Sequence, residues 1–378
     1  MSAVSRDPLR VLLVAARSAP YIGGVETHVH EVAPRLAQAG LDVTVLSTDT
    51  TRQLPATERV GKVQVLRVPA WPADRDYFLA PDVYRVITAG RWDVIHCQGY
   101  HSFVPPIAML AARRTRTPYV LTFHSAGHSS HLRNSLRGVQ WMLLRPLLAR
   151  ARHLIAVSRF EAEFFQQRLR LPRERFSIIP NGSNLPVVST PAPASDGTGR
   201  PLIASIGRLE RYKGHHRVIA ALPQVLREYP GARLHIVGSG PYEPQLRRLA
   251  DNLGVAQHVT IRALSPGDRL GMAKLLARAQ LVTLLSEYES QGLAALEAVA
   301  VGRPVLVTAT SGLLELAERQ LVRAIPQHSN AHQVAAAMLE QLRRPAAPKP
   351  PSLPTWDACA AALLDVYRAT ARSCACAS

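Results

Sequence analysis

Short apolar runs, many of them β-branched, alternate with stretches of helical periodicity along most of the chain. In the first half, the runs predict strands over 9–15, 43–47, 63–68, 94–96, 119–123, 153–157 and 177–179. After the first run, apolar residues recur at steps of four, three and four, which predicts an amphipathic helix over 25–38. Pro34 lies inside this helix and should kink it or remove a hydrogen bond. Buried strands that alternate with helices are typical of βαβ units and a mostly parallel sheet.

The alternation stops at 183–200, where the sequence SNLPVVSTPAPASDGTGR has the composition of a linker. It then restarts, with strands expected over 202–207, 233–237, 259–262, 281–285 and 304–308 and helices over 215–229 and 244–254. A Pro-rich stretch, 344–354, precedes a final helix expected over 356–371, which should pack back onto one of the domains. We therefore expect an N-terminal domain over 1–182, a linker over 183–200, a C-terminal domain over 201–355 and a closing helix and tail over 356–378.

Composition narrows the class of protein. Of the 378 residues, 47% are hydrophobic and 19% are charged, which excludes wholesale disorder. The formal net charge is +18, but only four of the 45 basic residues are lysines, so we attribute part of the charge to arginine-rich codon usage. The remainder indicates a preference for anionic partners such as phosphates or membrane surfaces.

The cysteines and the hydropathy of the chain exclude further classes. Cys97, Cys359, Cys374 and Cys376 form no disulfide or metal-ligand framework. No apolar run approaches 18 residues, and the first run is too short for a secretory signal. We expect a soluble, cytoplasmic protein.

Candidate ligand-binding residues follow the expected strands. Gly23 and Gly24 form the first strand-to-helix turn, where backbone can approach a ligand and a helix N-terminus can bind an anion. The turn lacks the GxGxxG dinucleotide fingerprint, which argues against NAD chemistry, and a plain tight turn is the alternative. Arg208 and Lys213 lie five residues apart in a loop that leads into a helix, where they could grip a phosphate or simply be solvated.

Two carboxylates flank a predicted helix start in the second domain. Glu289 is expected in the loop after the strand at 281–285, and Glu297 lies more than one turn into the helix that begins near Gly292. At these positions both carboxylates suit hydrogen bonding to hydroxyls. A solvated helix explains Glu297 alone, but it does not explain the coincidence with the preceding loop.

Glu289-x7-Glu297 with residues 298–305 resembles the signature of the retaining GT4 glycosyltransferases. Seven further segments match the family in the same order: 23–29, 122–124, 157–158, 179–182, 207–214, 236–241 and 356–368. The resemblance covers nearly the whole chain. It implies an α/β fold of the GT-B type, with two Rossmann-like domains facing across a cleft and a C-terminal helix that crosses back to the N-terminal domain. The acceptor would bind mainly the N-terminal domain and the nucleotide-sugar the C-terminal one.

The resemblance also implies roles for individual residues of this chain. Arg208 and Lys213 would hold the donor diphosphate, Glu297 the ribose hydroxyls and Glu289 the transferred sugar, with His124 beside the sugar at the reacting face. Further donor contacts are implied for Gly23, Gly24, Gly292 and Leu293, and the base would lie near Arg262 and the 238–241 turn that contains Gly240.

The chemistry that the family implies is transfer of a hexose-type sugar, from UDP or GDP, with retention and without a protein nucleophile. The leaving diphosphate takes the acceptor proton on the same face, and the cations stabilise its developing charge. No cofactor and no divalent metal are expected, and the chain lacks the Asp-x-Asp motif of metal-dependent transferases. The acceptor is a hydroxyl of a sugar, a cyclitol, a lipid-linked saccharide or a small metabolite.

The chain departs from the family pattern at three positions. Thr-x-His-Gly is replaced by a segment in which Ser125 follows His124, and Glu-Gly-Phe-Gly becomes Glu289-Ser290-Gln291-Gly292. After Thr308, where the family commonly has a Gly-Gly loop, this chain has Ser311-Gly312, so the donor contacts of that loop are not transferred.

Histidines and basic segments leave alternatives open. His128 and His131, in the loop after His124, could act as a general base, orient the acceptor, bind a metal or be ordinary polar residues. The basic stretches 113–116 and 133–152 could rest on an anionic membrane at its inner face, or the latter could be a helix packed inside.

Two alternative functions make different demands on the sequence. A sugar-nucleotide hydrolase or epimerase would need a further base that the sequence does not show. A non-catalytic nucleic-acid-binding protein would need basic residues interleaved with aromatics, which make up only 6% of the chain.

Overall fold

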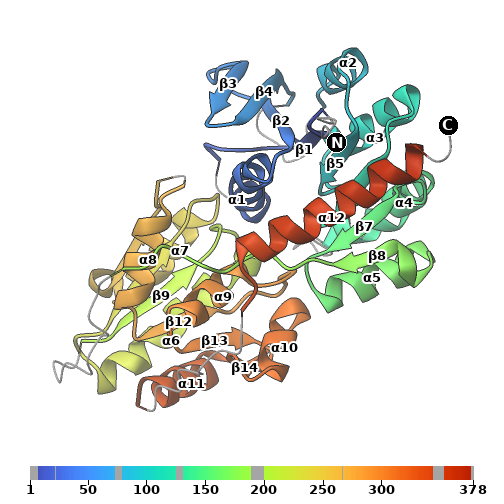
Figure 1. Cartoon of the computed structure of the whole chain (residues 1–378). Helices are drawn as coiled ribbons and strands as arrows, with labels where there is room; N and C mark the ends of the chain where they lie inside the picture. Colours follow the sequence, from blue (N-terminus) through green and yellow to red (C-terminus); the bar gives the residue numbers. More distant parts are fainter. Residues whose placement is uncertain are drawn as a thin grey trace, which may run out of the picture. The chain divides into compact units, whose positions relative to one another are not determined.

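A computed structural model describes residues 7–21, 23–72, 79–124, 131–188, 200–265, 267–343 and 353–375, with the backbone alone for 131–139 and 373–375. The chain forms two compact units. The first lies within residues 1–126, 135–181 and 356–378, and the second within 127–134 and 182–355. Each unit is an α/β structure built around one sheet (Figure 1).

The first unit contains an eight-stranded sheet in the order β3-β4-β2-β1-β5-β6-β7-β8. All neighbours are parallel except β3 and β4. The strands are β1 (Arg10–Ala15), β2 (Asp42–Asp49), β3 (Thr57–Val60), β4 (Val63–Pro69), β5 (Val94–Gln98), β6 (Tyr119–Thr122), β7 (His153–Ala156) and β8 (Phe176–Ile178). The helices are α1 (Gly24–Gln38), α2 (Asp82–Ala89), α3 (Val104–Thr115), α4 (His131–Leu148), α5 (Arg159–Leu169) and α12 (Trp356–Ala375).

The second unit contains a six-stranded, fully parallel sheet in the order β11-β10-β9-β12-β13-β14. The strands are β9 (Leu202–Ile206), β10 (Arg233–Val237), β11 (Val259–Arg262), β12 (Leu281–Leu284), β13 (Val305–Thr308) and β14 (Arg323–Ile325). The helices are α6 (His215–Glu228), α7 (Glu243–Asn252), α8 (Arg269–Arg278), α9 (Leu293–Ala300), α10 (Ser311–Glu318) and α11 (Ala331–Arg343).

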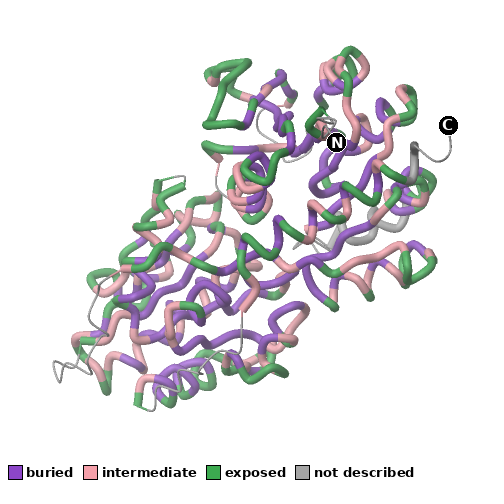
Figure 2. The backbone as a smooth tube through the Cα atoms, in the orientation of Figure 1, coloured by how far each residue is buried: buried purple, intermediate pink, exposed green. Residues whose placement is uncertain are grey.

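Central strands are buried on both faces, as their continuous apolar sequences require. Residues 11–15 of β1 are completely buried, and Figure 2 shows the central strands of both units as buried while the helices alternate between buried and exposed faces. In the second unit one core lies under α6, α7 and α11 and a second under α8, α9 and α10, on the two faces of the sheet. The predicted strands are therefore confirmed, most of them with ends within one or two residues.

Some elements differ from the prediction. The sequence analysis missed β3 and β14, a fully exposed antiparallel edge strand and a three-residue strand, because neither carries an apolar pattern. The predicted helix over 25–38 is α1, which continues through Pro34. Since proline has no N–H, the helix loses one backbone hydrogen bond there.

The closing helix α12 packs onto the first unit, in agreement with the prediction that it packs back onto one of the two domains. α12 contacts α1 and β5 of the first unit. Trp356, Leu363 and Tyr367 are completely buried, and Arg35 of α1 pairs with Asp357 at 2.8 Å.

The strand order reverses at one point in each sheet, between β1 and β5 and between β9 and β12. In open α/β sheets, ligands bind beyond the carboxyl ends of the strands at such a switch point. The segments that follow these strands are therefore the first place to look for function. They contain Gly23 in the first unit and Arg208, Lys213 and Glu289 in the second.

Candidate active site

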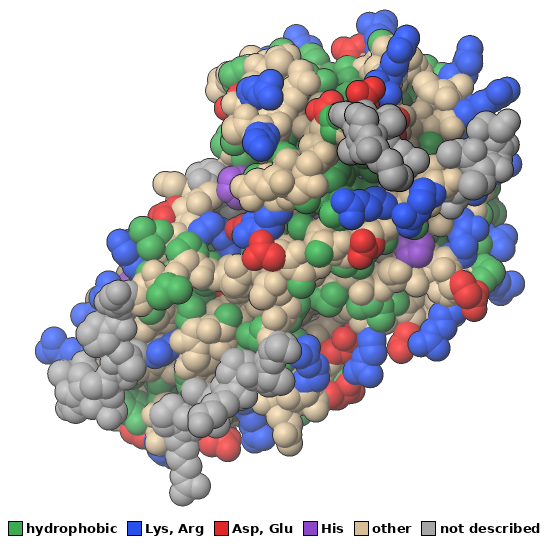
Figure 3. All heavy atoms as spheres, viewed as in Figure 1, with side chains coloured by type: hydrophobic (Ala, Val, Ile, Leu, Met, Phe, Trp, Pro, Cys, Tyr) green, Lys and Arg blue, Asp and Glu red, His purple; other side chains and the backbone are tan. Residues whose placement is uncertain are grey.

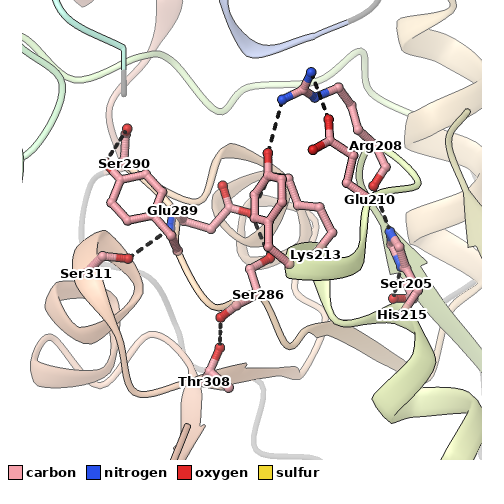
Figure 4. A network of polar contacts seen from close by, with 12 residues as sticks. Ser205, Arg208, Glu210, Lys213, His215, Ser286, Glu289, Ser290, Thr308 and Ser311 are labelled. Atoms are coloured by element: carbon pink, nitrogen blue, oxygen red, sulfur yellow. Dashed lines mark hydrogen bonds and ion pairs between the residues drawn. The ribbon is translucent and has the colours of Figure 1, made fainter. Parts of the chain in front are cut away.

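The loops after β9 and β12 lie directly against each other in the second unit. Gly214 has a φ of +75°, and a Cβ there would collide with the carbonyl oxygen of Leu285. The amide of Glu287 donates to the carbonyl of Tyr212 at 2.7 Å. Glycine at 214 thus permits the contact that brings the basic loop beside the acidic one (Figure 4).

Lys213 and Glu289 form an ion pair across this contact. Nζ of Lys213 lies 2.7 Å from Oε1 of Glu289, and both side chains are 15% exposed. Ser286 donates a second hydrogen bond to the same oxygen at 2.9 Å. Burial opposes the charge of Lys213, but the carboxylate of Glu289 outweighs it together with the lesser influence of Tyr212, so the pKa of Lys213 is raised. Lys213 is therefore charged at neutral pH.

Arg208 lies at the more open end of the same loop. Its side chain is about half exposed, pairs with Glu210 at 3.0 Å and donates to the hydroxyl of Tyr212 at 3.0 Å. The structure thus brings together three predicted site residues, Arg208, Lys213 and Glu289, in one polar network (Figure 4).

His215 supports this loop from below, and the sequence analysis did not single it out. Its Nδ1 accepts from Ser205 Oγ at 2.8 Å, and its Nε2 donates to the carbonyl of Arg208 at 3.3 Å. Burial lowers the pKa of His215 to about 4. The neutral ring therefore links β9 to the backbone of Arg208.

Glu297 is almost fully buried on α9 and does not stand alone. Its carboxylate pairs with Arg269 of α8 at 2.7 Å, with side-chain exposures of 4% and 18%. Sequence reasoning missed Arg269 because 28 positions separate it from Glu297 and nothing in its local pattern distinguishes it from other arginines. Gly292, with a φ of +76°, is the N-cap of α9, and Leu293 is the first residue of this helix.

The glycines of the 238–241 turn have a packing role. A Cβ at Gly238 would collide with the carbonyl of Gly207, and one at Gly240 would lie 2.5 Å from the carbonyl oxygen of Leu209. Arg262 has an exposed side chain at the end of β11, and its carbonyl accepts from the amide of Gly238 at 3.0 Å. The predicted contact of this region with a base remains a prediction.

In the first unit, the Gly23–Gly24 turn opens α1. The amide of Thr27 donates to the Gly23 carbonyl at 2.9 Å, and a Cβ at Gly23 would collide with the carboxylate of Glu26. Apart from its chain neighbours and the nearby backbone of α1, no described residue has an atom within 4 Å of a Cβ placed on Gly24. The space for a close approach to the backbone is therefore at Gly24, whereas Gly23 accommodates an acidic side chain.

His124 ends a chain of buried hydrogen bonds that reaches α12. Its Nε2 donates to Gln98 Oε1 at 2.7 Å, and Gln98 Nε2 donates to Nδ1 of His96 at 3.2 Å. His96 also accepts from the Tyr367 hydroxyl at 2.6 Å, and its Nε2 donates to Thr122 at 2.8 Å. Burial, reinforced by neighbouring histidines, holds the pKa of both His96 and His124 well below the usual value. Because the Gln98 oxygen can only accept, His124 carries its proton on Nε2.

His28 packs against this network from α1. Its ring centroid lies 4.7 Å from that of His124 and 6.1 Å from that of Trp356. Its Nδ1 donates to Asn181 Oδ1 at 2.7 Å, and burial lowers its pKa to about 4. Sequence reasoning had placed His28 and Asn181 only within matching segments, because 153 positions separate them.

Two predicted acceptor-side residues are not tested by this geometry. His128 lies outside the described residues, and the side chain of His131, the first residue of α4, is also outside them. Among the residues that are described, no group of three or more His, Cys, Asp or Glu side chains could hold a metal ion.

The helix that could rest on a membrane is α4. Trp141 and Leu144 are buried, as expected of a helix packed inside, whereas Met142 and Leu143 are each 67% exposed. None of the helices searched in the described part of the chain is long and apolar enough to span a membrane. On the face that Figure 3 shows, basic side chains are spread over the surface with acidic ones among them.

Comparison with known proteins identifies the family. Residues 22–185 match the family model described as Glycosyltransferase Family 4, and residues 192–351 match that of Glycosyl transferases group 1. A glycogen synthase of Mycobacterium tuberculosis is 30% identical over 81% of this chain and 80% of its own length. A D-inositol 3-phosphate glycosyltransferase of Nocardiopsis dassonvillei is 29% identical over 96% of this chain and 95% of its own.

Solved structures agree on the fold. A sucrose-phosphate synthase of Thermosynechococcus elongatus matches with a TM-score of 0.73 at 21% identity, covering 98% of each chain. The Anabaena protein HepE in complex with UDP and glucose matches with a TM-score of 0.69 at 19% identity, covering 97% of this chain and 98% of its own. The chain belongs to the GT4 family of glycosyltransferases and has the GT-B fold. It is a glycosyltransferase that takes its sugar from a nucleotide-sugar donor.

Proposed function

We propose that this enzyme transfers a hexose from UDP or GDP to a hydroxyl acceptor with retention of configuration. The observation that carries this proposal is the network at the β9/β12 switch point, where Arg208 and Lys213 stand beside Glu289. Two cations are placed to hold a diphosphate, and a carboxylate beside them suits the hydroxyls of an attached sugar. The names of the relatives support the donor class, since HepE is described with UDP and glucose.

The proposed reaction needs no protein nucleophile. The bond between the anomeric carbon and the diphosphate oxygen breaks, the acceptor oxygen bonds to that carbon on the same face, and the acceptor proton passes to the leaving phosphate oxygen. Charge accumulates on the diphosphate in the transition state, so fixed cations accelerate the step. Arg208 and Lys213 take this role, and no divalent metal or cofactor takes part.

The remaining site residues complete the assignment. Residues 201–355 form the donor domain, in which Glu297 binds the ribose and Gly240, Arg262, Gly292 and Leu293 line the donor. Residues 1–182 form the acceptor domain, in which Gly24 and His124 face the reacting groups, with Gly23 at the same turn. The acceptor is a sugar, a cyclitol, a lipid-linked saccharide or a small metabolite. The inositol phosphate in the name of one relative favours a polar acceptor.

A nucleotide panel tests the proposal. Thermal unfolding is measured with UDP, GDP, ADP and dTDP, first on the unaltered chain and then on Arg208→Ala and Lys213→Ala. A ligand at about 100 times its Kd stabilises the native state by roughly 2.7 kcal/mol, so a rise in Tm with UDP or GDP that both variants lose is expected. Retention is then checked by NMR of the anomeric proton of the product, with and without EDTA. An inverted product or a requirement for metal would refute the mechanism.

A cytoplasmic location, with contact to an anionic membrane surface through α4, is part of the same proposal. The exposed side chains of Met142 and Leu143 and the net charge of +18 support it. Co-sedimentation with phosphatidylglycerol vesicles, weakened by Met142→Ser and Leu143→Ser, is the expected result.

A further inference from the structure

The backbone of Glu289 is held from both sides by the 308–312 loop, which runs from the last residue of β13 into the first turn of α10. The Glu289 amide donates to the hydroxyl of Ser311 at 2.8 Å, and the Gly312 amide donates to the Glu289 carbonyl at 2.9 Å. A Cβ at Gly312 would collide with the Ser290 carbonyl, so the two segments touch. These two bonds fix the backbone on either side of the Glu289 side chain, and Figure 4 shows the one from the Glu289 amide to Ser311.

Two threonines of the same loop extend this contact to the preceding residues. Thr308 donates to the carbonyl of Ser286, and Thr310 donates to the carbonyl of Glu287 at 3.1 Å. Ser286 in turn donates to Oε1 of Glu289. The loop therefore holds the whole 286–289 segment and not a single residue.

Ser311 adopts a backbone conformation that favours glycine. Its φ is +44°, in the left-handed region that residues with a side chain rarely occupy. A serine here is disfavoured for the backbone, but it supplies a hydroxyl oxygen, which glycine lacks and which accepts from the Glu289 amide. Unfavourable backbone conformations concentrate where they serve a functional site.

The carboxylate of Glu289 has one oxygen engaged and one not. Lys213 and Ser286 both bond to Oε1, and among the described residues none bonds to Oε2. A fixed backbone and a fixed Oε1 leave Oε2 in one place, ready to accept a hydrogen bond from a hydroxyl.

We propose that Ser311 is a positioning residue that sets the place of Glu289 Oε2 for a hydroxyl of the transferred sugar. The proposal rests on the function proposed for Glu289, contact with that sugar. Ser311 does not touch the donor itself. It acts through the Glu289 amide, and its effect is confined to the sugar part of the donor.

The experiment compares the affinity for a nucleoside diphosphate with that for the matching sugar nucleotide, by calorimetry on the full chain. The probes are UDP with UDP-glucose and GDP with GDP-mannose, and the pair that the unaltered chain binds is used. The terminal phosphate of the free nucleoside diphosphate carries an extra charge, so the sugar contacts are reported by the change in the ratio of the two Kd values between the unaltered chain and a variant. We expect Ser311→Gly to reduce this sugar-dependent gain by about threefold to tenfold, the worth of one hydrogen bond, with the Kd of the nucleoside diphosphate unchanged.

Three variants separate positioning from a merely structural effect. Ser311→Ala keeps the unfavourable φ without the acceptor and should lose the same gain, whereas Ser311→Asn tolerates this φ and carries an acceptor, so it should keep most of the gain. Gln320→Gly is the matched control, since Gln320 is exposed, follows α10 and has a φ of +57°. It relieves a similar backbone conformation and should leave both affinities unchanged.

The outcomes distinguish this proposal from the function on which it rests. If Glu289→Ala abolishes the sugar-dependent gain but Ser311→Gly keeps it within twofold of the unaltered chain, the proposal for Ser311 is overturned and the function of Glu289 stands. If the unaltered chain binds neither pair, or Glu289→Ala has no effect, the function proposed for Glu289 is wrong and Ser311 fails with it.

Discussion

The regions at the two switch points of this glycosyltransferase differ in charge. In the second unit, the side chains around Lys213 carry full charges and are held by ion pairs such as the one with Glu289. In the first unit, His28, His96 and His124 are desolvated and neutral, held by hydrogen bonds and ring contacts. Charge is thus concentrated at the proposed diphosphate site, whereas the histidine region holds its rings in place without charge. The difference suits a reaction whose charge develops on the leaving group.

The largest effect is expected when the ion pair between Lys213 and Glu289 is removed. Lys213→Met should lower kcat by about 10²- to 10³-fold, the usual loss when a donor to a developing anion is removed. It should also destabilise the fold by about 2 kcal/mol, because a mostly buried Glu289 is left unpaired, discounted for its partial exposure. Urea unfolding and steady-state rates measure the two effects.

Adding Glu289→Gln to that variant should restore stability but not activity. Lys274→Ala, on the exposed face of α8, is the control and should change neither. A single Lys213 variant with near-normal kcat would mean that charge at this loop is structural only.

The neutral histidines predict that acid destabilises the first unit. The pKa of His28 is about 4 in the folded chain and about 6.5 when unfolded. Between these values the unfolded chain binds more protons, so stability falls as the pH drops from 6.5 toward 4 and is unaffected by this group above 6.5. The total loss from His28 is about 3 kcal/mol. His28→Gln removes the group and should make the pH dependence of urea unfolding less steep, since His96 and His124 still contribute.

His30 provides the matched control, because it lies on the same helix and is exposed. His30→Gln should leave the pH dependence as it is. Equal pH profiles for the unaltered chain and His28→Gln would show that His28 is not kept neutral by the fold.

The smallest expected effect concerns the first unit and tests whether Gln98 fixes the tautomer of His124. Gln98→Met removes the acceptor for His124 Nε2–H and should lower kcat by about tenfold, because the imidazole is free to adopt the other tautomer. Gln98→Glu keeps an acceptor but adds a charge, which should raise the pKa of His124 and move the acid limb of the pH–rate profile to higher pH. Nitrogen-15 NMR of the imidazoles reports the tautomer directly. An unchanged tautomer in Gln98→Met would contradict the assignment.

The sequence predicts the backbone elements of this protein better than it predicts the contacts between side chains. Continuous apolar runs such as 11–15 were readable because a strand buried on both faces has no polar positions. Arg208, Lys213 and Glu289 could be predicted together since each follows a strand, and strand ends of a parallel sheet meet at one edge. Their family motifs then supplied the roles.

What the sequence did not reveal depends on side chains that meet only after folding. Arg269, His215 and Tyr367 lie in ordinary helical segments, and their partners are determined by packing. The sequence predicted a donor contact for the turn at Gly240. A Cβ at this position would collide with the backbone of Leu209, which is a packing reason for glycine that the local sequence does not show. The φ of +44° at Ser311 was equally invisible, because serine is not a residue from which such a conformation is predicted.

The closing helix has a consequence for how the protein is made. The last large side chain to enter the first unit, Tyr367, bonds to His96, which is synthesised 271 residues earlier. A ribosome therefore completes all of the second unit before the first can fill its core, and a fragment that stops at residue 182 would leave the site of Trp356 and Tyr367 bare. During synthesis, the first unit therefore cannot complete its core until the C-terminal helix α12 has been made.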